Sequence, residues 1–380
     1  MQPQPGCFFW FAGMVVLFLS TTFTYAIDTS DAIETLSNYQ SSQNDLPQAV
    51  AAVAQLKQAD ASSLIPLLDG IAGAKPEAIN WLAGAYGHIV RKTAKQDLLA
   101  RKGDFLSYIQ NTEKAPRARF LAFETLTAID AQTAGQLKAS FLTDPSDELR
   151  RMGVAVAIDE AAQAEGDSKK ALLQKALTGA SDKDQVDAIA KSLKTLDVEV
   201  DLHQHYGLIT SWHVIGPFDN LEEKGFDVVY PPERSVDLNA SHEGMHGTVS
   251  WAPLTTEDNY GTFDLAKLTE PHKGAIDYLF TEFTVSEGQP VEFRFGTPNA
   301  WKLWINGELV FAREEYHRSE RFDQYRIPGT LKKGKNTILL KVCQNEQEQP
   351  WAQKWQVQFR ITNPYGFAIL PSDAPAGESN

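Results

Sequence analysis

Residues 301–311 read WKLWINGELVF, and this stretch decides the fold of the region around it. Two largely apolar runs are joined by Asn306-Gly307. Both residues readily adopt a positive φ, which the two central positions of a type I′ turn require. Asn-Gly between two alternating runs is the strongest short-range signal of a β-hairpin. The sequence therefore predicts two antiparallel strands joined at Asn306-Gly307.

Further strands are expected on both sides of this hairpin. Apolar and polar residues alternate with period two, which is typical of a strand with one buried face. Many short strands with turn residues between them, and no helical pattern in between, favour an antiparallel β-sandwich or jelly roll. The additional expected strands occupy residues 212–218 (ending in a Gly-Pro turn), 276–285, 291–295, 336–342 and 355–361.

The first half of the chain has a different period. From about residue 31 to residue 197, apolar residues recur at helical spacing, and proline falls between the segments. Short helices with similar residue patterns are expected at 114–126, 144–158 and 181–190, and they recur about every 30–40 residues. This repetition predicts an α-solenoid of HEAT-like repeats, with a plain helical bundle as the alternative.

The chain as a whole is therefore expected to be a multidomain protein, α-helical first and β second, since 380 residues exceed the usual size of one core. We expect a signal peptide at 1–26, an α-helical HEAT-like repeat domain at 27–200, an antiparallel β-sandwich at 201–370, and a disordered tail at 371–380.

Two motifs of the β region resemble a known family. The run ending in Asn306-Gly307 is followed by a polar stretch and then by GKNTILLKV at residues 334–342. This order is similar to the sugar-binding jelly roll of family 2 glycoside hydrolases, in which a later Gly-x-Asn turn opens a strand that completes the sheet. The likeness extends over residues 207–362. The hydrolases' catalytic barrel, with its two carboxylates, has no counterpart in this sequence.

Segments 212–220 and 225–233, and the residues from Trp251 onward, look like secreted bacterial proteins that join HEAT-like repeats to such a sandwich. The resemblance implies a galactose-binding-like fold and a protein of the binding-module class. It implies no particular ligand. Sandwiches of this kind carry carbohydrate binders, spacers and protein-docking modules alike, so the fold alone does not fix the function.

The N-terminus predicts export. Residues 7–19 form a short apolar run, and small and polar residues follow it up to Ala26. This is the pattern of a secretory signal peptide, and the run is shorter than a spanning helix needs. No Lys or Arg precedes the run, so an uncleaved anchor is the alternative. After cleavage we expect no membrane span, a periplasmic or extracellular location, and Cys343 as the one remaining cysteine, buried in a strand.

The charge of the chain argues against nucleic-acid partners. The formal net charge is −14, and Lys and Arg form no long block. Nucleic-acid binding depends on cationic contacts to phosphates, so an acidic chain without a basic stripe is a poor candidate. The expected partners are carbohydrate or an envelope protein. The oligomeric state is left open.

No catalytic, nucleotide or zinc motif appears in the sequence, so no catalytic residue and no resident metal or cofactor is assigned. A structural calcium is the one cofactor kept open, because loop carboxylates often hold one in modules of this kind. The aspartates concerned are Asp219, Asp227, Asp258 and Asp264.

A candidate ligand site comes from two polar segments of the β region. Sugar binding needs a flat apolar face together with amide and carboxylate partners for hydroxyl groups, and both residue types occur there. The predicted ligand-binding residues are Tyr316, His317, Arg318, Asp323, Gln344, Asn345 and Trp351. The opposing interpretation is that Trp351 is a core aromatic and the amides form a solvated turn.

Three functions follow from these observations, in decreasing order of preference. The first is an exported, non-catalytic protein whose sandwich binds carbohydrate or a glycan-bearing partner. The second is a structural protein-protein interaction component of the envelope, without a small-molecule site. The third is a glycoside hydrolase, which needs two carboxyl groups facing each other across a pocket.

Overall fold

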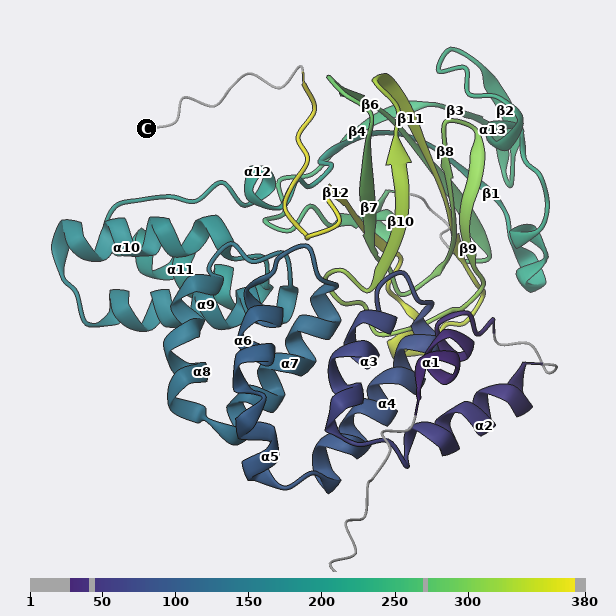
Figure 1. The fold of residues 1–380 in the computed structure, drawn as a ribbon. Helices are drawn as coiled ribbons and strands as arrows, with labels where there is room; N and C mark the ends of the chain where they lie inside the picture. The colour runs from purple at the N-terminus through teal and green to yellow at the C-terminus, as the bar shows by residue number, and fades with distance from the viewer. Residues whose placement is uncertain (1–27, 41–44, 269–272, 373–380) are drawn as a thin grey trace, which may run out of the picture. The chain divides into compact units, whose positions relative to one another are not determined.

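The computed structural model describes residues 28–40, 45–268 and 273–372. The expected signal peptide at 1–26, and residues 373–380 of the expected tail, lie outside these ranges. The chain groups into two compact units, one up to Asp130 and one from Ala131 onward. Figure 1 shows helices in the first unit, and helices followed by strands in the second.

The first unit consists of helices that pack as neighbouring pairs: α1 on α2, α3 on α4, and α6 on α7. Proline occupies the first position of α4 and α7, where its missing N–H costs nothing, so it marks the boundaries of these segments. Each helix buries its apolar face; in α4 this face carries Leu82, Tyr86 and Ile89. The helices are α1 (Ser30–Ser37), α2 (Leu46–Leu56), α3 (Leu64–Gly70), α4 (Pro76–Lys92), α5 (Lys95–Ala100), α6 (Lys102–Gln110) and α7 (Pro116–Ile129).

The second unit begins with helices that share a core with residues next to the sandwich. Val154, Leu173 and Ile189 from three successive helices belong to one apolar cluster with Tyr206 and Leu208. Rings of the β region pack against this cluster as well. The helices are α8 (Ala131–Leu137), α9 (Asp147–Ala162), α10 (Gly166–Gly179), α11 (Lys183–Lys194), α12 (Leu202–Tyr206) and, within the β region, α13 (Pro231–Arg234).

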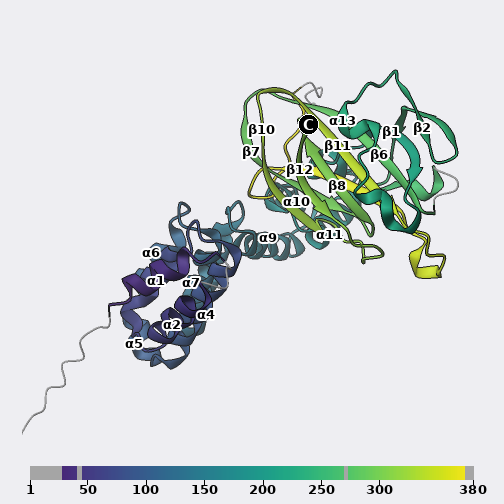
Figure 2. The same cartoon turned by 90° about the vertical axis from the view of Figure 1, so that its right-hand side faces the viewer.

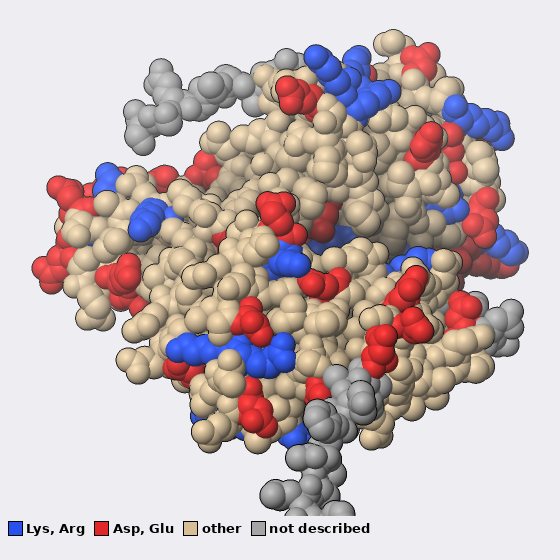
Figure 3. Space-filling view, viewed as in Figure 1, with Lys and Arg blue, Asp and Glu red and all other residues tan. Residues whose placement is uncertain are grey.

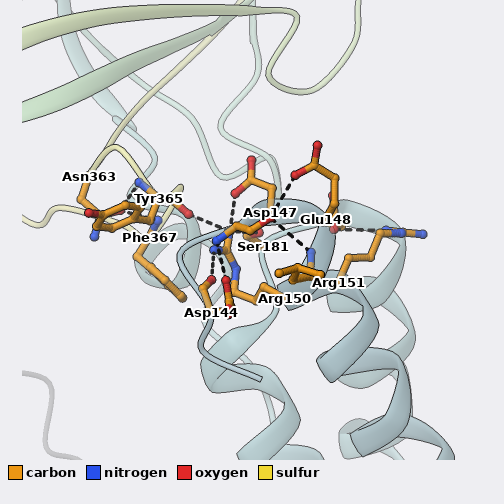
Figure 4. A network of polar contacts seen from close by, with 12 residues as sticks. Asp144, Asp147, Glu148, Arg150, Arg151, Ser181, Asn363, Tyr365 and Phe367 are labelled. Atoms are coloured by element: carbon orange, nitrogen blue, oxygen red, sulfur yellow. Dashed lines mark hydrogen bonds and ion pairs between the residues drawn. The ribbon is translucent and has the colours of Figure 1, made fainter. Parts of the chain in front are cut away.

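A buried arginine joins α9 to the segment after the last strand (Figure 4). The Arg150 guanidinium is 1% exposed. It donates to the carbonyl oxygen of Asp144 at 2.7 Å, to the carboxylate of Asp147 at 2.6 Å, and to the carbonyl oxygen of Tyr365 at 2.7 Å. The Phe367 ring lies under the same guanidinium, 4.6 Å from it. Charge-assisted bonds of this kind are strong, so they hold the helices and the sandwich together within this unit.

The β region consists of two antiparallel sheets and a small hairpin (Figures 1 and 2). The six-stranded sheet has the order β4-β1-β6-β11-β8-β9, and the four-stranded sheet has the order β10-β7-β12-β5. β2 and β3 form the hairpin. The strands are β1 (Ser211–Asp219), β2 (Ser241–Gly244), β3 (Gly247–Ser250), β4 (Ala252–Thr255), β5 (Phe263–Asp264), β6 (Ala275–Val285), β7 (Gln289–Gly296), β8 (Ala300–Ile305), β9 (Glu308–Arg313), β10 (Tyr325–Leu331), β11 (Gly334–Gln344) and β12 (Gln356–Thr362).

Aromatic side chains of both sheets fill the space between them. Trp301 of β8 stacks on Phe295 of β7 with ring centroids 3.9 Å apart, and Trp212 of β1 meets Phe359 of β12 edge to face. All four belong to one buried cluster that draws on both sheets. Burial of such large apolar surfaces is the main stabilising contribution of this region.

The hairpin at Asn306-Gly307 is confirmed. β8 and β9 are paired antiparallel, and the two turn residues have φ values of 54° and 83°. Cys343 lies in β11 and is fully buried, also as expected. The strand expected at 212–218 is confirmed as β1, but the turn expected at Gly216-Pro217 is wrong. β1 continues through this dipeptide to Asp219, and a bulge between Ile215 and Phe218 accommodates it.

The order of helices first and antiparallel sheets second is confirmed, and the sheet arrangement is consistent with a sandwich. The stacking of the helices as HEAT-like repeats stays a prediction. Strands begin at Ser211, after α12, whereas the compact units divide after Asp130. The change of secondary structure and the division into units are therefore different boundaries, and the expected domain ranges stay a prediction.

Candidate functional site

Two loops of the sandwich, the β9–β10 loop (residues 314–324) and the β11–β12 loop (residues 345–355), hold most of the predicted site residues. They meet at His317, whose Nε2 lies 2.6 Å from the side-chain oxygen of Asn345. The imidazole also stands edge-on to the Trp351 indole, with ring centroids 5.2 Å apart. His317 has a φ of 56°, a left-handed conformation that these contacts compensate.

Asn345 connects these two loops to a third, residues 220–227 after β1. Its amide nitrogen donates to the Glu223 carboxylate at 2.8 Å, and its side-chain oxygen also accepts from the backbone N–H of Gln347 at 3.2 Å. The Glu346 carboxylate accepts from the backbone N–H of Glu222 at 2.7 Å. Because Glu222 and Glu223 both have positive φ, these bonds maintain a loop conformation that would otherwise be unfavourable.

Buried amide side chains form hydrogen bonds that hold the loops in place. The side-chain oxygen of Gln344 accepts from Asn299 at 3.1 Å, and its amide nitrogen donates to the carbonyl oxygens of Ala352 and Lys354. Asn220 donates to the Tyr316 hydroxyl at 3.1 Å, and burial raises the pKa of that phenol. Gln344 and Asn345 are buried, so their amides position the loops and do not face solvent.

Trp351 is the exposed member of this group. Its side chain is 63% exposed, whereas Trp355, four residues later, is fully buried. The loop that carries Trp351 is fixed by Lys273, whose ammonium donates to the carbonyl oxygens of Gln347 and Ala352 at 2.6 and 2.8 Å. A single exposed aromatic ring is normal on a protein surface, but one on a loop held by hydrogen bonds presents a flat apolar face in a fixed position. We call Trp351 with the adjoining His317 ring the Trp351 platform.

Two of the predicted residues lie elsewhere. Arg318 is exposed and pairs with the Glu315 carboxylate at 2.9 Å, and together with Arg313 it lowers the pKa of that carboxyl group. Asp323 belongs to the β9–β10 loop, but its side chain is buried against the face of the four-stranded sheet. The structure thus brings together Tyr316, His317, Gln344, Asn345 and Trp351, and separates Arg318 and Asp323 from them.

Asp323 forms the centre of a buried ion-pair network. Arg360 of β12 donates to it with two nitrogens, and Arg294 of β7 donates at 2.8 Å. The two arginines are cross-strand partners, and Arg294 also pairs with Glu292 at 2.7 Å. Burial alone would raise the pKa of Asp323, but the hydrogen bond and charge of Arg360, followed by those of Arg294, lower it below the usual value.

Glu223 and Glu346 complete the loop cluster, and neither is among the predicted ligand-binding residues. Both follow strands, but only the strand order places the ends of β1 and β11 side by side through β6. Strand pairing between distant segments cannot be recognised from local patterns.

The four aspartates considered for calcium make separate contacts. Asp219 and Asp258 accept backbone N–H groups of their own loops, Asp227 pairs with Lys302, and Asp264 pairs with Lys267. Among the described residues, no three His, Cys, Asp or Glu side chains gather as metal ligands would. No helix in the described part of the chain is long and apolar enough to cross a membrane.

Charges of both signs are mixed on the face seen in Figure 3, where Lys and Arg side chains lie among Asp and Glu. The longest blue run lies at the lower left of this face, and red side chains lie above and below it. This distribution agrees with the net charge of −14.

Comparison with known proteins gives a limited result. No protein-family model matches the sequence, and no curated protein is significantly similar to it. Among solved structures, a β-glucosidase from Kluyveromyces marxianus in complex with glucose is 15% identical with a TM-score of 0.26, over 40% of this chain and 16% of that one.

A β-glucuronidase from an uncultured Clostridium sp. is 12% identical with a TM-score of 0.23, over 41% of this chain and 28% of that one. The PA14 domain of the antifreeze protein MpAFP is 11% identical with a TM-score of 0.19, over 27% of this chain and 55% of that one. The hydrolases match the β-sandwich region. These similarities are too low to carry an argument about function.

Proposed function

We propose that this chain is an exported binding protein without catalytic activity, and that the Trp351 platform of its sandwich binds carbohydrate or a glycan-bearing partner. The observation that carries the proposal is the exposure of the Trp351 indole on a loop that hydrogen bonds from Lys273 and Gln344 hold in place. A fixed, flat, apolar ring matches the C–H face of a sugar, and preorganisation lowers the entropy lost on binding.

The carboxylates beside the platform support a non-catalytic role. Glu223 accepts from the Asn345 amide, and Glu346 accepts from the backbone of Glu222. Both groups are thus used to shape the loops. The experiment is a hydrolysis assay on a panel of aryl glycosides and polysaccharides; turnover that disappears in Glu223→Gln or Glu346→Gln would contradict this part of the proposal.

The glycan part of the proposal is tested with a glycan array. We expect the purified protein to bind a defined class of glycans in a saturable manner, and Trp351→Ala to abolish the signal while its circular dichroism spectrum stays that of the wild type. Trp351→Phe, which retains a flat ring, is the matched variant and is expected to keep part of the binding. Absence of binding to every glycan would contradict the proposal.

We infer further that the paired helices of the first unit stack as HEAT-like repeats and serve as a spacer or a second docking face. The pairing of α1 with α2, α3 with α4 and α6 with α7 supports this inference. Export to the periplasm or the cell exterior rests on residues 1–26, and fractionation of expressing cells tests it.

A purely structural role in an envelope assembly is the second candidate. It is favoured by apolar side chains on the β9 edge strand, where Leu309 is 53% and Val310 39% exposed. An edge strand presents unpaired backbone groups to a partner strand. Capture of an envelope protein by the wild type, lost in a Leu309→Lys variant that keeps its glycan profile, would favour this candidate.

A further inference from the structure

A cavity of about 530 Å³ lies between α11 and the sandwich, inside the second unit. Its volume falls within the range of small-molecule sites, about 300–1,000 Å³. We call it the polar pocket. Its walls include Lys183 of α11, Tyr260 of the β4–β5 loop, Glu320, Arg321 and Phe322 of the β9–β10 loop, and Gln356 of β12.

The aromatic side of the polar pocket is fixed by its neighbours. The Tyr260 and Phe322 rings meet edge to face with centroids 5.9 Å apart, and the Lys183 ammonium lies 3.9 Å above the Tyr260 ring. The Tyr260 hydroxyl bonds to the Asp187 carboxylate, and the Tyr260 carbonyl oxygen accepts from Gln358 at 2.6 Å. These contacts preorganise an apolar wall before any ligand arrives.

The charges that line the polar pocket balance. Lys183 and Arg321 supply two cations, and Asp258 and Glu320 supply two carboxylates. A ligand with a net charge would meet a group of its own sign as well as one of opposite sign. Hydrogen-bond donors and acceptors together with an aromatic wall suit an uncharged ligand with many hydroxyl groups.

Glu320 is the group that points to a ligand most directly. Its side chain is 16% exposed, and its nearest cation is the Lys354 ammonium at 3.9 Å. Within the described part of the chain it accepts no hydrogen bond, and burial raises its pKa above the usual value. Neither carboxylate oxygen is among the fully buried atoms that lack a partner, so water reaches the group in the free protein, and sugar hydroxyls at this point can replace that water.

We propose that the polar pocket binds a neutral saccharide unit, with the Glu320 carboxylate accepting hydrogen bonds from its hydroxyls and Tyr260 and Phe322 forming the apolar wall. This rests on the proposed function and adds a second subsite to it. The β9–β10 and β11–β12 loops meet at His317 and Trp351, and again at Glu320 and Lys354. The loops that form the Trp351 platform therefore continue into the polar pocket.

The test is isothermal titration calorimetry of the purified full chain with glucose, galactose, mannose, xylose and N-acetylglucosamine, and with disaccharides of each. We expect Glu320→Ala to weaken binding at least about tenfold, because a hydrogen bond to a charged group contributes at least that factor. Glu320→Gln keeps an acceptor, so its loss is expected to be smaller. Glu314→Ala, an exposed position in the same loop outside the polar pocket, is the matched control and is expected to bind like the wild type.

The outcomes separate the two proposals. If Glu320→Ala binds like the wild type while Trp351→Ala loses binding, the polar pocket is overturned and the platform stands. If Glu320→Ala loses binding while Trp351→Ala keeps it, the polar pocket stands and the platform is overturned. Glucosamine is titrated as well, as a cationic sugar, and binding of glucosamine with no binding of the neutral sugars would overturn the proposal that the ligand is neutral. A wild type that binds none of these sugars and no glycan on the array contradicts both proposals.

Discussion

The imidazole of His317 stands edge-on to the indole of Trp351, at a ring-centroid distance of 5.2 Å and an interplanar angle of 80°. The same imidazole bonds to the buried side chain of Asn345. One residue of the β9–β10 loop therefore holds the exposed aromatic ring of the β11–β12 loop from the side. This contact converts two separate connections into one rigid surface, on which the proposed binding function depends.

Substituting His317 tests this coupling of the two loops. We expect His317→Ala to lower the free energy of unfolding by about 1–2 kcal/mol, because a partly buried hydrogen bond is lost and the buried Asn345 oxygen loses a partner. Glycan binding should weaken at the same time, since Trp351 loses its lateral support. Urea unfolding followed by circular dichroism measures the first effect and the array the second. Unchanged stability and binding would show that the loops are fixed without His317.

Removing the charge of Asp323 leaves two buried guanidinium groups without their shared carboxylate. We expect Asp323→Asn to lower the free energy of unfolding by about 3 kcal/mol, because breaking a buried ion pair on one side leaves uncompensated charge. The matched control is Glu315→Gln, which breaks the surface ion pairs with Arg313 and Arg318 and should leave the urea midpoint nearly unchanged. Equal effects of the two substitutions would mean that the buried network contributes no more than a surface pair.

The same carboxyl group predicts a pH dependence. The pKa of Asp323 is lower in the folded protein than in the unfolded chain, so its stabilising contribution is complete above the unfolded value of about 3.9. It is lost progressively as the pH falls through the folded pKa. The difference in stability between the wild type and Asp323→Asn should therefore be constant from pH 7 to pH 5 and shrink below about pH 4. A difference that grows on acidification would contradict the direction of this shift.

Arg150 and Arg151 are adjacent on α9 and provide a matched pair of variants. Arg150 is buried between α9 and the segment after β12, whereas Arg151 forms solvent-exposed pairs with Asp182 and Asp184. Arg150→Ala should lower the free energy of unfolding by about 3 kcal/mol, and Arg151→Ala by less than about 1 kcal/mol.

Hydrogen exchange locates the Arg150 effect. We expect Arg150→Ala to accelerate exchange in α9 and in residues 363–369, because the bond to the Tyr365 carbonyl oxygen is lost. Acceleration confined to α9 would show that this arginine does not connect the two parts.

Local patterns were sufficient for much of the fold. The type I′ turn at Asn306-Gly307 depends only on the φ preferences of two residues, and the helix starts at Pro76 and Pro116 depend on the missing proline N–H. The burial of Cys343 was expected because a cysteine in an apolar strand is most often a small buried residue. Each of these features is determined within a few residues.

The candidate site was only partly predictable, because burial at loop ends depends on contacts between distant segments. Trp351 and Trp355 are the same residue type four positions apart, yet Trp351 is exposed and Trp355 is in the core. Arg294 and Arg360 lie on strands where charged residues usually indicate a solvated face. They are buried instead, because Asp323 of the β9–β10 loop covers them. No single segment carries the information that these residues meet.

The central claim is that the exposed ring of Trp351 is the surface that binds glycan. Titration of the array's best-binding oligosaccharide into the wild type, Trp351→Phe and Trp351→Ala, with heat as the readout, tests it most directly. We predict that Trp351→Phe retains binding with a modest loss of affinity and that Trp351→Ala loses at least about tenfold, which corresponds to about 1.4 kcal/mol. Equal affinity of all three proteins would contradict the claim.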